Sequence, residues 1–500
     1  NGFETKHYRS YGETQEYMRQ KEIFMPTEFL HGLYDGGHGA GLKDYWDMMM
    51  ANPRCAGGFL WDLMDQGVVR TDKNNYVDCM GNFGADGIVG PHAEKEGSYY
   101  TIKEVWCPVQ LTWNDVEKGE LTLSNQYNFV NLKDCRFSYR LLQMPAMGST
   151  QVKVLKQGNL SSPDVAPGKE AQVKIPMMAN ADAVEIKAVN HEGEEIMTWS
   201  RGVKSEERRV KNSSAPSTSS AAYADQADAV EVKAGGRTYR FAKKDGRLMG
   251  VEVGSKAISL SNGPRFMAAR RSDRSLDQFY NHDDKEAEKK KTLYTEFVDQ
   301  GAFAGFEWKE AEAKLVATYQ HGSLDEVDWQ FLSDGSVAVT CHYNFGGVVD
   351  MMGMAFDYPE SKVRSKAWVG NGPYRVWQNR EQGPQYGYWQ NDYNDPIPAE
   401  SWDYPEFKGY FANVKWMQFK TDEGKIGFSG LTADEHMGVY TPRDGRDGLL
   451  YTLPQTGLAV FKVIPSVRNK VNTTDLNGPS AQPKWLNGKG KVEFTLNFEL

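Results

Sequence analysis

The sequence predicts a multidomain, mainly β protein with a unit of a (β/α)8 barrel near its start. Three observations lead to this fold class. Residues 23–50 read as an apolar strand, an acidic residue, a Gly-rich loop and an amphipathic helix. From about 109 to 207, apolar and polar residues alternate with a period of two, which is typical of strands. After a polar stretch, strand and turn signals return from about 229 to the end.

The first unit places a carboxylate where a barrel carries its chemistry. Ile23-Phe24-Met25 forms the expected strand, Glu28 follows it, and residues 42–50 form the expected helix. In such barrels the catalytic residues lie at the C-terminal ends of the strands. A Glu that follows a strand is by itself most often a plain surface residue. Its role therefore depends on its neighbours in the sequence.

The composition excludes several function classes. The chain has 500 residues, a length that favours about two to four domains. Its net charge of −9 argues against a nucleic-acid-binding surface, which needs a basic face. Lys289, Lys290 and Lys291 stand among acidic residues and read as a solvated segment. No apolar run approaches the roughly 18 residues that a membrane span requires.

Aromatic residues and cysteines are the notable minor components. The 13 Trp, 25 Tyr and 23 Phe could form sugar-binding faces or fill β-sandwich cores, and we favour the cores. The five cysteines are odd in number and include no Cys-x-x-Cys pair, so we expect free, buried thiols. No zinc-like spacing of Cys and His occurs.

A second strand, which ends in Trp61-Asp62, extends the barrel pattern. Together with Glu28-Phe29-Leu30-His31, the Tyr45-Trp46 helix and Asp65-Gln66, the stretch Gly57-Gly58-Phe59-Leu60-Trp61-Asp62 resembles glycoside hydrolase family 2, and within it the large lactose-hydrolysing β-galactosidases. The resemblance implies that Glu28 is the nucleophile of a retaining mechanism. It also implies that residues 1–108 are the last strands of the barrel, so the chain would begin inside it, with the first half upstream.

The resemblance assigns roles to the neighbours of Glu28. Tyr8 would hydrogen-bond the nucleophile, although an ordinary packed Tyr is the alternative. His31 would contact the sugar or the surroundings of Glu28, where a plain surface residue is the alternative. Trp61 would give the sugar a hydrophobic platform. His38 has no counterpart in the family and is expected to be a flexible loop residue.

Residues 82–92 resemble the family stretch that closes the site. Phe83 and Asp86 fit the spacing of a Phe and an Asn that line the galactose pocket, and the Phe carbonyl there contacts a sodium ion. This chain carries Asp86 where the galactosidases carry Asn. A carboxylate suits a hard cation equally well, but the change puts strict galactose preference in doubt. A surface turn with a solvated Asp is the alternative.

The rest of the chain reads as two β-sandwiches. About seven short strands in residues 109–207 predict an immunoglobulin-like sandwich. Residues 208–228 are polar and small and predict a linker. Residues 229–500 resemble the large galactose-mutarotase-like sandwich of the same family, on the strength of residues 368–373, Trp-Val-Gly-Asn-Gly-Pro. In the family this domain lends a Trp to the active site, and Trp485 is a candidate, with plain packing as the alternative.

The chain is predicted to be the C-terminal portion of a retaining exo-β-glycosidase. Among such enzymes, β-galactosidase is the favoured activity. The family's acid/base follows an Asn as Asn-Glu, and this pair is absent from the chain. We therefore expect the acid/base and the Mg²⁺ ligands upstream, and the chain alone to be inactive. The expected partners are an oligosaccharide with a terminal β-linked sugar and the N-terminal half of the same protein. A homo-oligomer is a further expected assembly. Alternatives are a carbohydrate-binding or scaffold fragment that uses aromatic residues 386–416, or a family 2 enzyme for another sugar. The sequence predicts no localisation.

Overall fold

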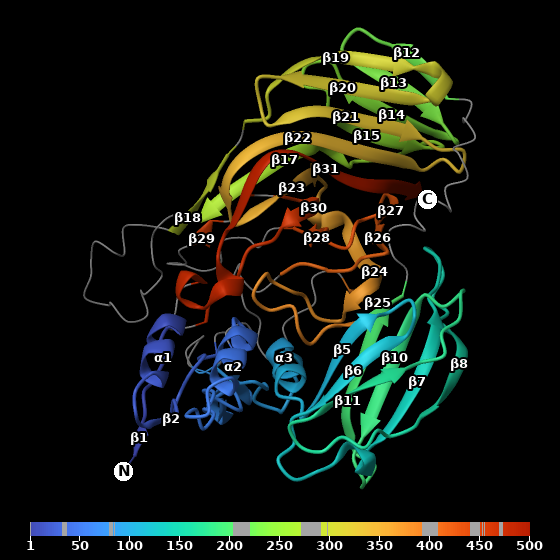
Figure 1. Cartoon of the computed structure of the whole chain (residues 1–500). Coiled ribbons are helices and arrows are strands. Elements are labelled where there is room, and N and C mark those ends of the chain that lie inside the picture. Colours follow the sequence, from blue (N-terminus) through green and yellow to red (C-terminus); the bar gives the residue numbers. More distant parts are fainter. Residues whose placement is uncertain are drawn as a thin grey trace.

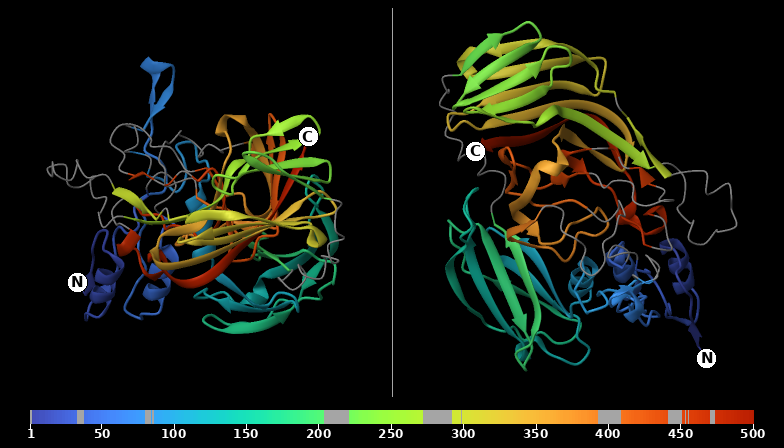
Figure 2. Two further views of the ribbon diagram at one scale, coloured as in Figure 1. Left: turned by 90° about the horizontal axis from the view of Figure 1, so that it is seen from above. Right: turned by 180° about the vertical axis from the view of Figure 1, so that it is seen from behind.

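The protein is multidomain and mainly β, with few helices and two large sheets. The computed structural model describes residues 2–32, 38–79, 84, 86–203, 221–271, 292–297, 299–392, 409–440, 451–452, 454, 456–469 and 474–500. A helix-bearing N-terminal region and a small sandwich lie side by side, and a larger sandwich lies across both (Figures 1 and 2). Among the described residues, no helix combines the length and apolar character needed to cross a membrane.

The N-terminal region is built on short parallel segments. Its described elements are β1 (Phe3–Glu4), α1 (Tyr11–Met18), β2 (Ile23–Phe24), α2 (Leu42–Met50), β3 (Val68–Arg70), η1 (Thr71–Lys73), β4 (Tyr76–Asp78) and α3 (Gly97–Val105). β1 pairs with β2 in parallel, and isolated parallel bridges continue the pairing outward from them. Each helix follows a segment of this parallel group, which is the order that the βα pattern predicted.

Local chemistry sets the helix ends. α1 begins at a capping box, in which Ser10 and Glu13 satisfy each other's backbone amides. α2 occupies the residues expected for it, 42–50. α3 begins at Gly97, and the residue at its N-cap is Glu96, whose side chain makes no capping hydrogen bond. The fully buried Ser98 lies inside the first turn.

The small sandwich follows α3 directly. Its strands are β5 (Val109–Asp115), β6 (Glu120–Asn125), β7 (Arg136–Gln143), β8 (Lys153–Leu160), β9 (Glu170–Lys174), β10 (Ala183–Val189) and β11 (Glu195–Gly202), with η2 (Leu132–Asp134) between β6 and β7. They form a four-stranded sheet in the order β11-β10-β7-β8 and a three-stranded sheet in the order β5-β6-β9. The inward residues of both sheets, among them Leu123, Phe137 and Ile186, form one core.

The large sandwich has two sheets of antiparallel character. The first contains β12 (Ala222–Asp225), β13 (Ala229–Ala234), β14 (Arg237–Ala242), β15 (Leu248–Val253), β16 (Lys256–Ile258), β17 (Ser261–Arg271), β18 (Thr292–Glu296), β23 (Met351–Asp357), β28 (His436–Val439), β29 (Tyr451–Thr452) and β30 (Leu458–Val463). The second contains β19 (Ala302–Lys309), β20 (Lys314–Gln320), β21 (Leu324–Phe331), β22 (Val337–Val349), β24 (Val363–Gly372), β25 (Gln385–Asp392), β26 (Trp416–Thr421), β27 (Gly424–Ser429) and β31 (Lys484–Glu499). Short 3₁₀ turns lie at Glu310–Glu312, Glu360–Lys362, Thr474–Leu476 and Pro479–Ala481.

Aromatic and aliphatic side chains fill the space between these sheets. Trp329 and Trp368 are fully buried there, as the core interpretation of the aromatic content predicted. The five cysteines are free and four are buried, which confirms the expected thiols. Of the expected linker 208–228, residues 208–220 lie outside the described residues. Residues 222–225 form β12, which pairs with β13, so the strands begin before position 229.

The large sandwich contacts both smaller parts of the chain. Ser200 of β11 donates from its hydroxyl to the carbonyl of Tyr386 in β25 at 2.6 Å. Trp416 donates from its ring Nε1 to the carbonyl of Pro145 at 2.9 Å, with both groups buried. On the helical side, the amide of Gly383 donates to the Glu104 carboxylate at 2.6 Å. The end of α3 is therefore anchored by a residue that lies 279 positions later in the chain.

Candidate active site

Backbone pairing brings Glu28 beside Tyr8. The two lie on neighbouring parallel segments, where the amide of Tyr8 donates to the carbonyl of Glu28 at 2.8 Å. On the other side, the amide of Phe29 donates to the carbonyl of Phe59 at 2.9 Å. Three segments that run in the same direction thus end at one edge, and the side chains that follow their ends meet there.

Four of the predicted site residues form a contiguous group at this edge. The Tyr8 hydroxyl donates a hydrogen bond to the Glu28 carboxylate. The ring of His31 lies 5.2 Å from the ring of Tyr8 and 6.5 Å from that of Trp61, measured between centroids. His31 is buried, Glu28 is partly exposed, and Trp61 is 36% exposed. One partly accessible site therefore contains a carboxylate, a phenol, an imidazole and an exposed indole face.

Asp86 lies behind this group and is buried. Its carbonyl accepts from the amide of Asp62 at 3.1 Å, and its carboxylate Oδ1 lies 3.8 Å from Nδ1 of His31. The backbone of Gly32 approaches it so closely that a Cβ there would lie 2.1 Å from the Asp86 carbonyl oxygen. Burial excludes the alternative of a solvated surface Asp. Phe83, the other predicted residue of this stretch, lies outside the described residues.

His38 differs from the expectation of a flexible loop residue. It is fully buried, and its Nε2 lies 2.6 Å from the carbonyl oxygen of Trp61, so Nε2 carries the proton that is donated. Burial, with a smaller contribution from the nearby Arg380 guanidinium, lowers the pKa of His38 to about 4. The prediction was wrong because the burial comes from distant parts of the chain. The neutral imidazole holds the backbone of the indole residue in place.

The large sandwich supplies that burial. Arg380 packs against Gly39, where an added Cβ would lie 2.5 Å from the arginine Cδ. The amide of Gly41 donates to the carbonyl of Asn379 at 2.9 Å. Asp44, in the first turn of α2, accepts from the amide of Ser480 at 2.7 Å. Residues 39–44 are thereby fixed by two stretches of the C-terminal half, which single-residue patterns could not have indicated.

Trp485 does not join this group. It lies near the start of β31, opposite Val348 of β22, and 70% of it is exposed. Among the described residues, no ring contact or hydrogen bond connects it to Tyr8, Glu28, His31 or Trp61. A role of Trp485 in the active site stays a prediction.

Comparisons with known proteins identify two parts of the chain. Residues 233–459 match the family model described as the β-galactosidase small chain. Residues 121–199 match the model described as β-galactosidase, domain 4. Both matched stretches lie in the two β-sandwiches and follow the group around Glu28.

One related protein matches most of the chain, and another matches a short part of it. A β-galactosidase of Oenococcus oeni is 19% identical over 92% of this chain and 47% of its own length. A β-galactosidase of Pectobacterium atrosepticum is 29% identical over 20% of this chain and 11% of its own length. Among solved structures, galactose 1-epimerase from Lactobacillus acidophilus is similar with a TM-score of 0.32 and 9% identity, over 56% of this chain and 98% of that one. The chain spans about half the length of the Oenococcus relative.

Proposed function

Because the chain is the C-terminal region of a glycoside hydrolase family 2 β-galactosidase, we propose that its first hundred residues contribute the nucleophile half of a retaining exo-β-glycosidase. The single observation that supports this most strongly is the hydrogen bond from Tyr8 to Glu28 at the shared edge of parallel segments. Parallel segments with intervening helices are the construction of a (β/α)8 barrel, which carries its chemistry at that edge.

In this proposal Glu28 attacks the anomeric carbon of a terminal β-linked sugar. The bond from Glu28 to the sugar forms as the bond to the leaving oxygen breaks, which gives a covalent glycosyl-enzyme. The Tyr8 hydroxyl orients the carboxylate and stabilises its negative charge through a charge-assisted hydrogen bond. When water later releases the sugar, the carboxylate of Glu28 re-forms as the leaving group.

The neighbours position the sugar. The exposed face of Trp61 offers an apolar platform for the C–H groups of the ring, and His31 lies between this platform and Tyr8. His38 holds Trp61 in position through its hydrogen bond to the Trp61 carbonyl. In this arrangement, the sugar lies on Trp61 with its anomeric carbon toward Glu28.

A retaining enzyme needs a second carboxylate about 5–5.5 Å from the nucleophile. We propose that an Asn-Glu pair upstream of Asn1 supplies it, together with the Mg²⁺ ligands. The buried Asp86 carboxylate has the oxygen chemistry that fits a sodium ion, and with the Phe83 carbonyl it would hold this ion as a fixed positive charge at the pocket. Loss of a general acid/base costs about 10²–10⁴ in rate, and we therefore expect no measurable turnover by the chain alone.

The domain assignment belongs to the same proposal. Residues 1–108 form the end of the barrel, and 109–207 form an immunoglobulin-like sandwich. The galactose-mutarotase-like sandwich begins with β12 (Ala222–Asp225) rather than at residue 229, so the linker is shorter than the predicted 208–228.

Asp86 favours a second candidate for the substrate. A carboxylate accepts hydrogen bonds but donates none when ionised, whereas an amide does both. A family 2 enzyme for a sugar other than galactose therefore remains the alternative. The carbohydrate-binding fragment is less favoured, since Tyr386 is packed against Gly202 of the small sandwich rather than open to a ligand.

One assay tests the proposal. The chain and a protein extended by its upstream residues are compared on chromogenic β-galactosides, β-glucosides and β-mannosides. We expect turnover by the extended protein alone. Turnover by the 500-residue chain would contradict the inference that its acid/base lies upstream. An extended protein that is inactive on every β-glycoside would contradict the assignment as a β-glycosidase.

A further inference from the structure

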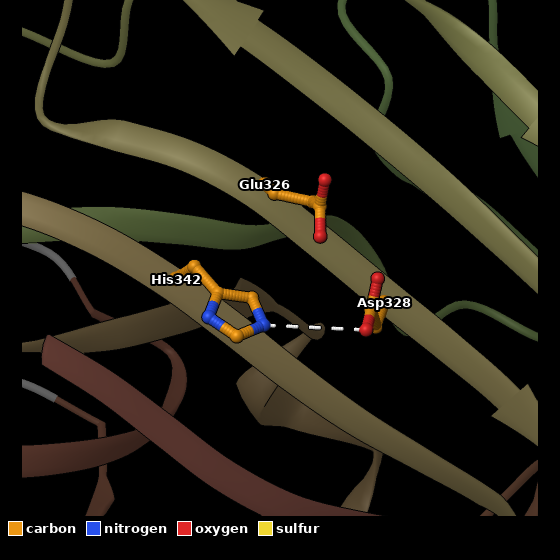
Figure 3. A group of neighbouring side chains, drawn as sticks. All are labelled: Glu326, Asp328 and His342. Atoms are coloured by element: carbon orange, nitrogen blue, oxygen red, sulfur yellow. Dashed lines mark ion pairs between the residues drawn. The ribbon is translucent and has the colours of Figure 1, made fainter.

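Three metal-ligating side chains converge on the outer face of the nine-stranded sheet, far along the chain from the site around Glu28. They are Glu326 and Asp328 of β21 and His342 of β22, and Figure 3 shows them facing one another across the two strands. One ligand atom from each lies within 4.8 Å of the others. Nε2 of His342 is 4.0 Å from Oδ2 of Asp328.

The strands themselves produce this arrangement. Residues two apart in a strand point to the same face, so Glu326 and Asp328 share one side while Val327 and Trp329 point into the core. The register places His342 directly opposite Glu326. Both strands are interior members of the sheet, so the backbone that carries the three ligands is held by pairing on either side.

The electrostatic surroundings favour a cation. Oδ1 of Asp328 is buried and accepts no hydrogen bond from the described residues, an arrangement that costs free energy unless another donor or ion is present. Oδ2 of Asp328 lies 3.3 Å from the ammonium of Lys314. On the β31 side, Lys491 pairs with Glu493 at 3.0 Å. Each lysine thus has an acidic partner, and Glu326 adds a further negative charge.

Lys314 can move away from Asp328 and still keep an acidic partner. Its ammonium also lies 3.4 Å from the carboxylate of Glu312. A doubly charged ion at Asp328 would displace the lysine toward Glu312, so that both Asp328 oxygens become available.

We propose that Glu326, Asp328 and His342 bind a divalent transition-metal ion of the Zn²⁺ type, with water in the remaining position. One imidazole with two carboxylates suits zinc, whereas calcium and magnesium prefer oxygen ligands alone. Ligands about 2.0–2.1 Å from zinc lie roughly 3.4 Å apart in a tetrahedron. The three side chains therefore need to close by about 1 Å, which rotation about their χ angles provides.

Titration calorimetry with ZnCl₂ on the chelator-treated full chain tests the proposal. The wild type should bind one ion in a saturable step, more tightly than Ca²⁺ or Mg²⁺ in parallel titrations. His342→Gln and Asp328→Asn should each weaken that step at least about tenfold. His321→Gln removes an exposed histidine of the same domain outside the cluster and should leave it unchanged.

A second measurement does not depend on heat. Zn²⁺ should raise the Tm of the wild type and of His321→Gln, because an ion that binds only the folded state stabilises it. It should not raise the Tm of His342→Gln. The proposal is overturned if no saturable step is seen, if both cluster variants bind zinc as the wild type does, or if Ca²⁺ binds more tightly than Zn²⁺.

Discussion

Tyr8 holds Glu28 by two hydrogen bonds, one from its backbone amide to the Glu28 carbonyl at 2.8 Å and one from its hydroxyl to the Glu28 carboxylate. Tyr8 does so from a left-handed backbone conformation, with φ of 49°. Such a conformation costs on the order of 1 kcal/mol for a residue with a Cβ. Both the backbone and the side chain of Tyr8 therefore contribute to the contact with Glu28.

Replacing Tyr8 by Phe tests the side-chain half of this contact. In the protein extended by its upstream residues, Tyr8→Phe should lower kcat by about a hundredfold, because a donor to the nucleophile is lost while the ring remains. Steady-state kinetics on a chromogenic β-galactoside measures this change. Tyr17→Phe, on a ring that stacks on Phe24 away from the group, should leave kcat near that of the wild type. Equal rates for both variants would contradict the assigned role.

Gly32 should not tolerate a side chain. A Cβ there would lie 2.1 Å from the Asp86 carbonyl oxygen and 2.2 Å from Cε1 of His38. Gly32→Ala should lower the free energy of unfolding by about 1–3 kcal/mol. Gly12→Ala, within α1 and with open space around it, should be neutral or stabilise by up to about 1 kcal/mol. Urea denaturation compares the two, and an equally stable Gly32→Ala would contradict the close packing.

The buried histidines predict a loss of stability in acid. Burial lowers the pKa of His38 to about 4, below the value of about 6.5 expected after unfolding. The unfolded chain then binds more protons between these values, so stability is complete above pH about 6.5 and falls as the pH approaches 4. The contribution of one such group is about 3 kcal/mol. Burial gives His436 of the large sandwich the same shift.

Thermal unfolding at several pH values between about 4.5 and 7 measures this dependence. His38→Gln keeps a donor for the Trp61 carbonyl but does not titrate, so its Tm should fall less in acid than that of the wild type. His191→Gln, at an exposed position of the small sandwich, should follow the wild type. Parallel curves for wild type and His38→Gln would contradict the neutral, buried state of His38.

Trp416 should be important for docking of the two sandwiches. Its Nε1 donates to the carbonyl of Pro145 inside a cluster that joins the small and large sandwiches. Trp416→Phe keeps an aromatic ring but leaves that carbonyl without its donor, so the free energy of unfolding should fall by about 1–3 kcal/mol. Trp113→Phe, at the edge of the small core, should cost less. Denaturant titration with fluorescence measures both, and the reverse order would contradict the role of this contact.

The sequence predicted what is local and missed what is distant. Period-two alternation located the strands of 109–207, and helical periodicity located residues 42–50, because each pattern reflects the nearest neighbours in the chain. The resemblance to glycoside hydrolase family 2 implied that Glu28, His31 and Trp61 lie close together. The burial of His38 did not, since Arg380 and Asn379 lie some 340 residues later. Likewise, the pairing of β22 with β31 joins segments about 150 residues apart, which no single-segment pattern encodes.

The proposed function depends on a covalent bond from Glu28 to a sugar. The most direct measurement treats the upstream-extended protein with a mechanism-based inactivator of retaining β-galactosidases and maps the labelled peptide by mass spectrometry. We predict the label on Glu28, with Glu28→Gln neither labelled nor active. A label on another carboxylate, with Glu28 unmodified, would contradict the assignment of Glu28 as the nucleophile.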